Sequence, residues 1–339
     1  MAQEITLYFG MGCFWGAQQR LRVLPGVVAT EVGYAGGDDP NPTYERVLAF
    51  ERALRAGVAS GRNHAEVVKV VWEPPRSEAD QLVPLLAQLL AAFWAGHDPT
   101  QRDRQGNDIG SNYRSALYYE ANDDAVWLLP LLLASRAAYA WALWQAAGGA
   151  PRFSAPTTEI APVRHYTPAE SYHQDYLIKH PDGYCGLGGT GVHLPPYPWT
   201  LPGAELRAFW AWLGQAVLSP EAFAIAFEHG TERPFTGCHL HEKRPGRFFD
   251  PLSGALLFRS ATKFESGSGW PSFFAAEPDA LTEHEDRSYG MVRTEVRSRA
   301  TGIHLGHVFP DGPPPTGLRY CINGNVLAFA PGAEAEGAA

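Results

Sequence analysis

A cysteine near the N-terminus stands where reactive thiols are often found. Cys13 follows an apolar run that predicts a buried strand, comes after Gly10 and Gly12, and precedes residues that favour a helix. A thiol at a helix N-terminus lies at the positive end of the helix dipole, so we expect a lowered pKa for Cys13. Phe14 and Trp15 place two large aromatic side chains beside it. On these residues alone, a buried structural cysteine is an equally good interpretation.

A second group of soft side chains lies in the C-terminal half of the chain. Cys238, His239 and His241 are close in sequence, and His304 and His307 follow farther on. Because cysteine and histidine bind zinc and copper, a metal-binding protein is one interpretation. Against it, Cys238 and His239 are adjacent, and adjacent residues of a strand point to opposite faces.

The composition limits the classes of function. Four cysteines in 339 residues do not make a disulfide-rich scaffold, and the chain has no C-x-x-C motif, which argues against a general thiol–disulfide oxidoreductase. Hydrophobic residues make up 45% and charged residues 19%, which is typical of globular proteins. The 27 basic and 36 acidic residues give a net charge of −9, which disfavours binding to nucleic acid or to an anionic membrane.

Neither the N-terminal segment nor the most apolar stretch of the chain indicates a secreted or membrane protein. The N-terminus has no basic region followed by an apolar core, so no signal peptide is expected. The most apolar stretch, 125–150, contains Pro130 and Arg136, which predicts one or two buried helices in place of a membrane span. We therefore expect a soluble, cytoplasmic protein whose thiols stay reduced.

The elements that must position these residues form two regions of different character. Before residue 194, strand-like runs alternate with helical stretches, including 77–95, which predicts a layered domain of strands and helices. Four prolines within 194–203 predict a connector, and a short helix follows it. Beyond it, short strand-like runs separated by Gly, Pro and Asp predict an all-β domain.

The first region, roughly residues 4–198, resembles methionine sulfoxide reductase A. Five blocks occur in that family's order: GCFWG at Cys13, GYAGG at 33–37, HAEVV at 64–68, QGNDIGSNYRS at 105–115 and YCGLGG at 184–189. The resemblance implies roles for seven residues near the sulfoxide. They are Cys13 as nucleophile, Glu66 as acid, Tyr34 and Tyr113 as phenols that bind the oxygen, Asp108 as a supporting carboxylate, and Phe14 and Trp15 as the pocket for the S-methyl group.

The chemistry that this resemblance implies needs these residue types. A sulfoxide sulfur is a weak electrophile until its oxygen is protonated or strongly hydrogen-bonded, so the site needs a thiolate, an acid that stays neutral, and donors for the oxygen. An apolar surrounding raises the pKa of a carboxyl such as Glu66 and keeps it protonated. Without the blocks, Glu66 would be interpreted as a solvated strand residue, and Tyr34 and Tyr113 as ordinary core or surface tyrosines.

The resemblance also implies how the oxidised nucleophile is recycled. Cys185, in a glycine-rich stretch, matches the resolving cysteine that condenses with the sulfenic acid on Cys13. Many members carry a further cysteine where this chain has His193. The Cys13–Cys185 disulfide is therefore expected to be the species that thioredoxin reduces.

The second region, roughly residues 217–331, resembles methionine sulfoxide reductase B. Its blocks are TERPFTG at 231–237, KFESGSGWPSF at 263–273, HLGHVFPDGP at 304–313 and RYCING at 319–324. The resemblance implies Cys321 as nucleophile, His304 and His307 near the sulfoxide oxygen, Asp311 and Asn323 as supporting polar residues, and Trp270 as the wall for the methyl group. Arg319 is expected to hold Cys321 as thiolate. Taken alone, both histidines would be interpreted as structural.

This region departs from the family in two ways. Many members bind a structural zinc through two C-x-x-C pairs, whose places are taken here by Asp250, Ser253, Ser298 and Thr301. We therefore expect no zinc. The usual resolving cysteine is replaced by Ser268, which leaves Cys238 as the other cysteine of this region and the candidate partner of Cys321.

The sequence thus predicts a repair enzyme that reduces both epimers of methionine sulfoxide, with thioredoxin as reductant and no metal or organic cofactor. The predicted domains are 1–198, a two-layer α+β (ferredoxin-like) fold; 199–216, a linker with a short helix; 217–331, a mainly antiparallel all-β fold; and 332–339, a disordered tail. Because the sulfoxide sulfur is a stereocentre, one rigid pocket fits one epimer. The segment 45–60, longer than the family usually has, receives no role.

Overall fold

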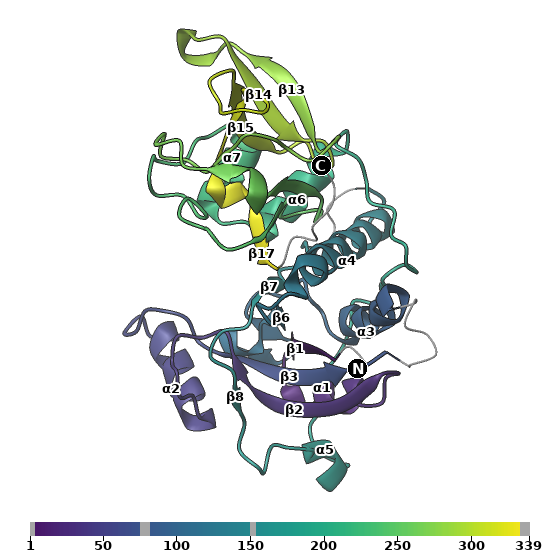
Figure 1. Cartoon of the computed structure of the whole chain (residues 1–339). Helices are drawn as coiled ribbons and strands as arrows, with labels where there is room; N and C mark the ends of the chain where they lie inside the picture. Colours follow the sequence, from purple (N-terminus) through teal and green to yellow (C-terminus); the bar gives the residue numbers. More distant parts are fainter. Residues whose placement is uncertain (1–3, 75–81, 150–153, 333–339) are drawn as a thin grey trace. The chain divides into compact units, whose positions relative to one another are not determined.

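The computed structural model describes residues 4–74, 82–149 and 154–332. The chain divides into two compact units, Met1–Glu120 with Ala138–Trp199 and Ala121–Ala137 with Thr200–Ala339. The predicted fold classes are confirmed, because the first unit mixes helices with a sheet and the second is built mainly of antiparallel strands (Figure 1). The start of the predicted helix at 77–81 and, apart from its first residue, the predicted tail lie outside the described residues.

The first unit is built on a six-stranded sheet in the order β7-β6-β1-β3-β2-β8. Its strands are β1 (Ile5–Met11), β2 (Val27–Ala35), β3 (Ala65–Trp72), β6 (Ser115–Tyr119), β7 (Glu159–Pro162) and β8 (Thr167–Pro168). All pairs are antiparallel except β6 with β7. The central strands β1 and β3 are almost wholly buried, as their runs of apolar and β-branched residues require.

Helices and short turns surround this sheet. They are α1 (Phe14–Leu21), α2 (Tyr44–Arg55), α3 (Leu82–Gly96), the second half of α4 (Ala125–Ala146), α5 (Tyr176–Lys179), the ladder of β4 (Arg104–Gln105) with β5 (Asp108–Ile109), and the 3-10 turn η2 (Ser111–Tyr113). Helix α1 contacts β2, β3 and α3 and therefore lies on the sheet. Helix α2 stands apart from the sheet at one side of this unit (Figure 1).

Helix α4 runs without a break through Pro130 and Arg136, so the apolar stretch forms a single helix, in keeping with the prediction of one or two. A proline inside a helix removes one backbone hydrogen bond. Leu128 and Leu132 are buried along the same helix, and this packing outweighs the loss of one bond. By length and composition α4 could cross a membrane, but 67% of its most apolar part is buried inside the protein, as in a core helix.

Among the described residues, the second unit contains two antiparallel sheets, the first half of α4 and two further helices. The helices are α6 (Arg207–Val217) and α7 (Pro220–Glu228), and the smaller sheet has the order β10-β9-β17, with β9 (Gly246–Phe249), β10 (Leu256–Arg259) and β17 (Ala328–Pro331). The larger sheet has the order β11-β12-β16-β15-β14-β13. Its strands are β11 (Lys263–Phe264), β12 (Ser272–Phe273), β13 (Leu281–Asp286), β14 (Arg293–Ser298), β15 (His304–Phe309) and β16 (Arg319–Ile322), and the turns are η3 (Ser260–Thr262), η4 (Ser288–Gly290) and η5 (Gly324–Val326).

Helix α7 is a feature that the sequence analysis misses. The Ser219 hydroxyl caps it by accepting a hydrogen bond from the backbone N–H of Ala222 at 3.1 Å. Pro220 occupies the first helical turn, where a missing N–H costs nothing. The dipeptide Ser219-Pro220 therefore marks the start of a helix. The prediction of strands alone beyond residue 217 overlooks it.

Three of the four positions compared above with zinc-binding C-x-x-C pairs, Asp250, Ser253 and Thr301, form a hydrogen-bonded cluster, whereas the buried hydroxyl of Ser298 has no hydrogen-bond partner among the described residues. Asp250 is fully buried, and its carboxylate accepts the backbone N–H of Ser253 at 3.1 Å and the hydroxyl of Thr301 at 2.6 Å. The buried Arg136 guanidinium of α4 supplies a positive charge that interacts with Asp250. One carboxylate and three hydroxyls, with no thiolate, do not fit a structural zinc, and this carboxylate is already engaged.

We predict that Asp250→Ala destabilises the second unit by ~3 kcal/mol, because it leaves buried donors and a buried guanidinium without their acceptor. Denaturant unfolding followed by tryptophan fluorescence measures the loss. Asp250→Asn, which keeps one acceptor oxygen, is the matched control and is expected to lose less. A chelator is expected to leave the wild-type midpoint unchanged; a lowered midpoint would show that a metal does stabilise this unit.

Candidate active sites

Cys13 is the N-cap residue of α1, at the junction of β1 with the helix. The turn depends on Gly12, whose φ is +91° and whose missing side chain leaves room for Gln105; a Cβ there would lie 2.6 Å from the Gln105 Cβ. Cys13 is only 9% exposed. Burial, and next the negative charge of Glu66, raise the pKa of its thiol, and the backbone N–H of Trp15 offsets only part of this. The predicted lowering of the Cys13 pKa is therefore wrong for the free protein.

Glu66 lies on β3 beside this thiol. The backbone N–H of Phe14 donates to its Oε2 at 3.3 Å, and the Asn112 side-chain amide donates to its Oε1 at 3.4 Å. Burial raises the pKa of Glu66 to about 8, although both hydrogen bonds act in the opposite direction. At neutral pH the carboxyl therefore holds a proton that it can donate.

Three tyrosines surround the carboxyl, and one of them was not predicted. Burial and Glu66 raise the pKa of Tyr113 on η2 and also that of Tyr44, the first residue of α2, which in addition feels Cys13. The Tyr34 hydroxyl, in contrast, donates to Glu170 Oε2 at 2.9 Å. Glu66 also contributes to the raised pKa of Tyr34, so all three phenols lie within electrostatic range of this carboxyl, and Tyr34 differs in that Glu170 engages its hydroxyl.

The aromatic residues after Cys13 form a packed wall. Phe14 is buried, and its ring lies 5.1 Å from that of His173. Trp15 stacks on Tyr176 at 3.8 Å and donates from its indole nitrogen to His173 Nδ1 at 3.1 Å. His173 also contacts the Tyr44 ring at 4.8 Å, so this buried histidine joins the wall to the phenol. The sequence analysis names neither His173 nor Glu170, although the segment 170–176 is rich in polar and aromatic residues.

The predicted resolving thiol lies against the same helix as the nucleophile. Cys185 is exposed, and its Sγ rests 2.7 Å from the point where a Cβ on Gly16 would stand, one turn after Cys13. It also contributes to the raised pKa of Cys13. Tyr184 hydrogen-bonds Asp108, a carboxylate that lies within electrostatic range of Cys13. The free thiols of Cys13 and Cys185 are thus held on one face of α1.

In the second unit, Cys321 lies on β16, directly opposite His307 on β15. The Ser268 hydroxyl is 3.7 Å from its sulfur. Burial raises the pKa of Cys321 in spite of Ser268 and Arg319, which both lower it. Arg319 also forms two hydrogen bonds of 2.9 Å with Asp311. The expectation that Arg319 keeps Cys321 as thiolate is therefore wrong for the free protein.

Both predicted histidines are held by carboxylates. His304 Nδ1 lies 2.6 Å from Glu295 Oε1, and His229 Nδ1 lies 3.0 Å from the same oxygen. His307 Nε2 lies 2.7 Å from Asp286. Among the described residues, His229, Glu295 and His304 are the one group close enough to share a metal ion. The metal-binding interpretation of the sequence centred on a different group, Cys238, His239 and His241.

The remaining predicted residues have structural contacts near Cys321. The Trp270 indole donates to the Glu232 carbonyl at 3.1 Å, and the Asn323 side chain accepts from Glu232 N at 3.0 Å. Cys238 is exposed. Its main chain packs against Gly324, where a Cβ would meet the Cys238 carbonyl oxygen at 1.7 Å.

Comparison with known proteins agrees with this arrangement. The family model described as peptide methionine sulfoxide reductase matches residues 5–190, and the SelR domain matches residues 218–331. The chain belongs to the peptide methionine sulfoxide reductase family. Its A-type domain is fused to a B-type domain, and the reductase acts on both the S and the R epimer.

Solved structures similar to the reductase match its first half. Methionine sulfoxide reductase A of Corynebacterium diphtheriae is 39% identical, with 54% of this chain and 77% of that chain covered and a TM-score of 0.40. Reduced Mxr1 from Saccharomyces cerevisiae is 29% identical, with coverages of 54% and 90% and a TM-score of 0.39.

We predict that Gly16→Ala in the reductase slows disulfide formation between Cys13 and Cys185 on the order of 10- to 100-fold, because the new methyl group displaces the Cys185 sulfur. Single-turnover release of methionine from the S epimer, which precedes this step, is expected to stay within a few-fold of wild type. Quenched-flow thiol counting measures both steps. Equal slowing of both would show that Gly16 acts on the nucleophile instead.

Proposed function

We propose that Cys13 reduces the S epimer and Cys321 the R epimer, each by way of a cysteine sulfenic acid. The observation that carries the first assignment is the buried Glu66, whose pKa of about 8 leaves it protonated beside a thiol that is itself protonated. A neutral acid can protonate the sulfoxide oxygen, which a carboxylate cannot.

In the first site, the Glu66 proton passes to the sulfoxide oxygen while the Cys13 sulfur attacks the sulfoxide sulfur. The thiol proton returns to Glu66, the oxygen ends on Cys13 as a sulfenic acid, and methionine leaves. The cysteine sulfur loses two electrons and the methionine sulfur gains them. Tyr44 and Tyr113 are the proposed donors to the oxygen, and Phe14 with Trp15 the proposed surface for the methyl group.

The resting pKa values support this coupled transfer. If Cys13 were a thiolate before substrate bound, the site would hold a buried negative charge, which burial disfavours. Two protonated groups avoid that charge until the sulfoxide arrives to accept a proton. Activity toward the S epimer is accordingly expected to fall as pH rises through about 8, where Glu66 loses its proton.

Recycling of the first site is proposed to run through Cys185. Its thiol attacks the sulfenic sulfur of Cys13, water leaves, and a Cys13–Cys185 disulfide forms. Because Cys185 is exposed and Cys13 is buried, an external dithiol reaches the Cys185 sulfur. Thioredoxin is the proposed reductant, and its two thiols end as a disulfide.

In the second site, a histidine takes the place of the carboxylic acid. His307 lies across the strand pair from Cys321, and Asp286 fixes its ring by a 2.7 Å contact. Burial lowers the pKa of His307, and Asp286 acts in the opposite direction. In its protonated form, His307 can donate a proton to the sulfoxide oxygen while Cys321 attacks. His304, held by Glu295, is the second proposed donor.

We predict that Cys13→Ser abolishes reduction of the S epimer and Cys321→Ser that of the R epimer, whereas Glu66→Gln slows the S epimer ~10²–10⁴-fold, because glutamine has no proton to give. The measurement is the rate at which the intact chain reduces each separated epimer. The rate for the other epimer is the control within each variant. An S-epimer rate for Glu66→Gln within a few-fold of wild type at pH 7 would remove Glu66 as the acid.

For the second site we propose that Cys238 resolves Cys321. Cys238 is exposed, and its main chain packs on Gly324, only three residues beyond Cys321 in the sequence. Ser268, which lies beside the Cys321 sulfur, has no thiol to offer. A shift of the loop that carries Cys238 toward β16 would pair two cysteines 83 residues apart in sequence.

One equivalent of the R epimer, added without reductant, is expected to give a Cys238–Cys321 disulfide in peptide mass mapping. Cys238→Ser is expected to leave Cys321 as sulfenic acid, and Cys185→Ser, in the other unit, is the matched control that should leave the pairing intact. Recovery of Cys321 only as sulfenic acid in the wild type, with Cys238 free, would contradict the pairing and favour direct reduction by an external thiol.

A further inference from the structure

Helix α2 begins one residue before the segment 45–60, to which the sequence assigns no role, and otherwise lies within it. Tyr44 is its first residue, and Val47 and Glu51 are its buried side chains. Beside it lies a cavity of about 620 Å³, lined by the α2 residues Arg46, Val47, Ala49, Phe50 and Ala53 and by residues of 38–39 and 60–64. Because open space and not a packed core adjoins this face, polar contacts must hold the helix in place.

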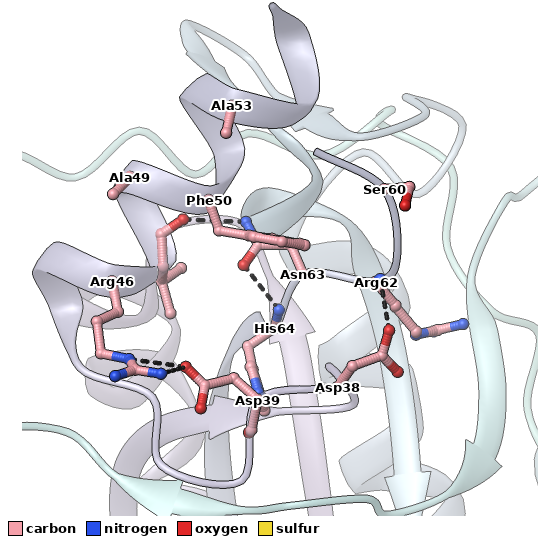
Figure 2. A pocket seen from close by; sticks show the side chains of 11 residues that line it. Asp38, Asp39, Arg46, Ala49, Phe50, Ala53, Ser60, Arg62, Asn63 and His64 are labelled. Atoms are coloured by element: carbon pink, nitrogen blue, oxygen red, sulfur yellow. Dashed lines mark hydrogen bonds and ion pairs between the residues drawn. The ribbon is translucent and has the colours of Figure 1, made fainter. Parts of the chain in front are cut away.

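Figure 2 shows two of these contacts at the cavity. Arg46 reaches Asp39, with its Nε 2.8 Å from Oδ2, and the Asn63 side-chain amide donates to the Val47 carbonyl at 3.1 Å. Arg46 and Asp39 are partly exposed, so their ion pair stabilises little. The buried contacts of α2 therefore matter more.

Glu51 makes the most extensive buried contact of this helix. Its Oε2 accepts hydrogen bonds from the Ser111 hydroxyl and from Asn63 Nδ2, the latter at 3.2 Å, and its Oε1 accepts from Arg55 Nε at 3.2 Å. Arg55 also donates to the Ile109 carbonyl. The carboxylate thus joins α2 to the start of β3 and to the first residue of η2.

The turn η2 carries two groups of the S-epimer site. Asn112 is fully buried and donates to Glu66 Oε1 at 3.4 Å, and Tyr113 interacts with Glu66. Ser111, which Glu51 holds, immediately precedes both. A displacement of Ser111 therefore moves the donor to the acid and the phenol together.

The charge of Glu51 makes this anchor constant over the working pH range. Burial alone would raise the pKa of Glu51, but hydrogen bonds from Ser111 and Asn63 lower it below its ordinary value. Glu51 is therefore ionised wherever Glu66 titrates, and each donor forms a charge-assisted hydrogen bond with it.

We propose that Glu51 is a positioning residue for reduction of the S epimer: it holds η2 so that Asn112 and Tyr113 keep their places at Glu66. This inference rests on the proposed role of Glu66 as the acid. It gives the long segment 45–60 a function, since the part of α2 that carries Glu51 lies within it.

The first test compares Glu51→Gln with Glu45→Gln, which removes the same charge from an exposed position of the same helix. Glu51→Gln is expected to lower kcat for the S epimer on the order of 10- to 100-fold. Loss of the Asn112 hydrogen bond also raises the Glu66 pKa, so the alkaline limb of the pH profile should move upward. Glu45→Gln, and the R-epimer activity of both variants, are expected to match wild type.

A double-mutant cycle separates positioning from general stability. If Glu51 acts through Asn112, adding Glu51→Gln to Asn112→Ala should reduce kcat by much less than it does in the wild type. Additive losses, an unmoved pH profile, or equal losses for both epimers would overturn the proposal. Normal S-epimer activity in Glu66→Gln would overturn the acid assignment instead, so the two failures are distinguishable.

Discussion

The candidate active site of the first unit depends on burying a carboxylic acid beside a thiol. Neither Glu66 nor Cys13 can ionise easily there, because burial disfavours a charge on either group and a charge on one disfavours a charge on the other. The surrounding elements serve this pair: β3 carries the acid, the β1–α1 junction carries the thiol, and η2 supplies a donor that moderates the acid. The site is thus poised by the absence of charge and not by a preformed thiolate.

The two halves of the chain meet the same chemical requirement with different groups. In the first, the proposed donor is a buried carboxyl that accepts hydrogen bonds from a backbone N–H and an amide. In the second, the proposed donors are two histidines that rest on Glu295 and Asp286. Asp286 has a pKa well below its ordinary value, because the backbone N–H and hydroxyl of Ser288, His307 and Arg293 all donate to it. Two domains of different fold therefore act on sulfoxides of opposite configuration at sulfur.

The sequence predicts the family, the two fold classes and the blocks that carry the catalytic groups, because ordered motifs encode which residues lie near one another. It does not predict which residue each tyrosine contacts. Tyr34 lies in a recognisable block but is bound by Glu170, whereas Tyr44 reaches the site only because α2 starts there. This difference is created by contacts between residues more than a hundred positions apart.

The direction of the cysteine pKa values is missed for a related reason. The position of Cys13 at a helix end is visible in the sequence, and a helix end favours a thiolate. How deeply the thiol is buried, and that its neighbour is an acid, follow only from the folded sheet. Local geometry and long-range burial act in opposite directions at Cys13, and burial prevails.

The hydrogen-bonded cluster around Asp250 has a consequence for a protein that works where oxidants are present. Zinc held by thiolates is lost when those sulfurs are oxidised. A carboxylate and hydroxyls contain no sulfur that an oxidant can attack, so oxidation does not break the contacts of this cluster. The four cysteines are free thiols outside this cluster, so each of them is a candidate for chemistry.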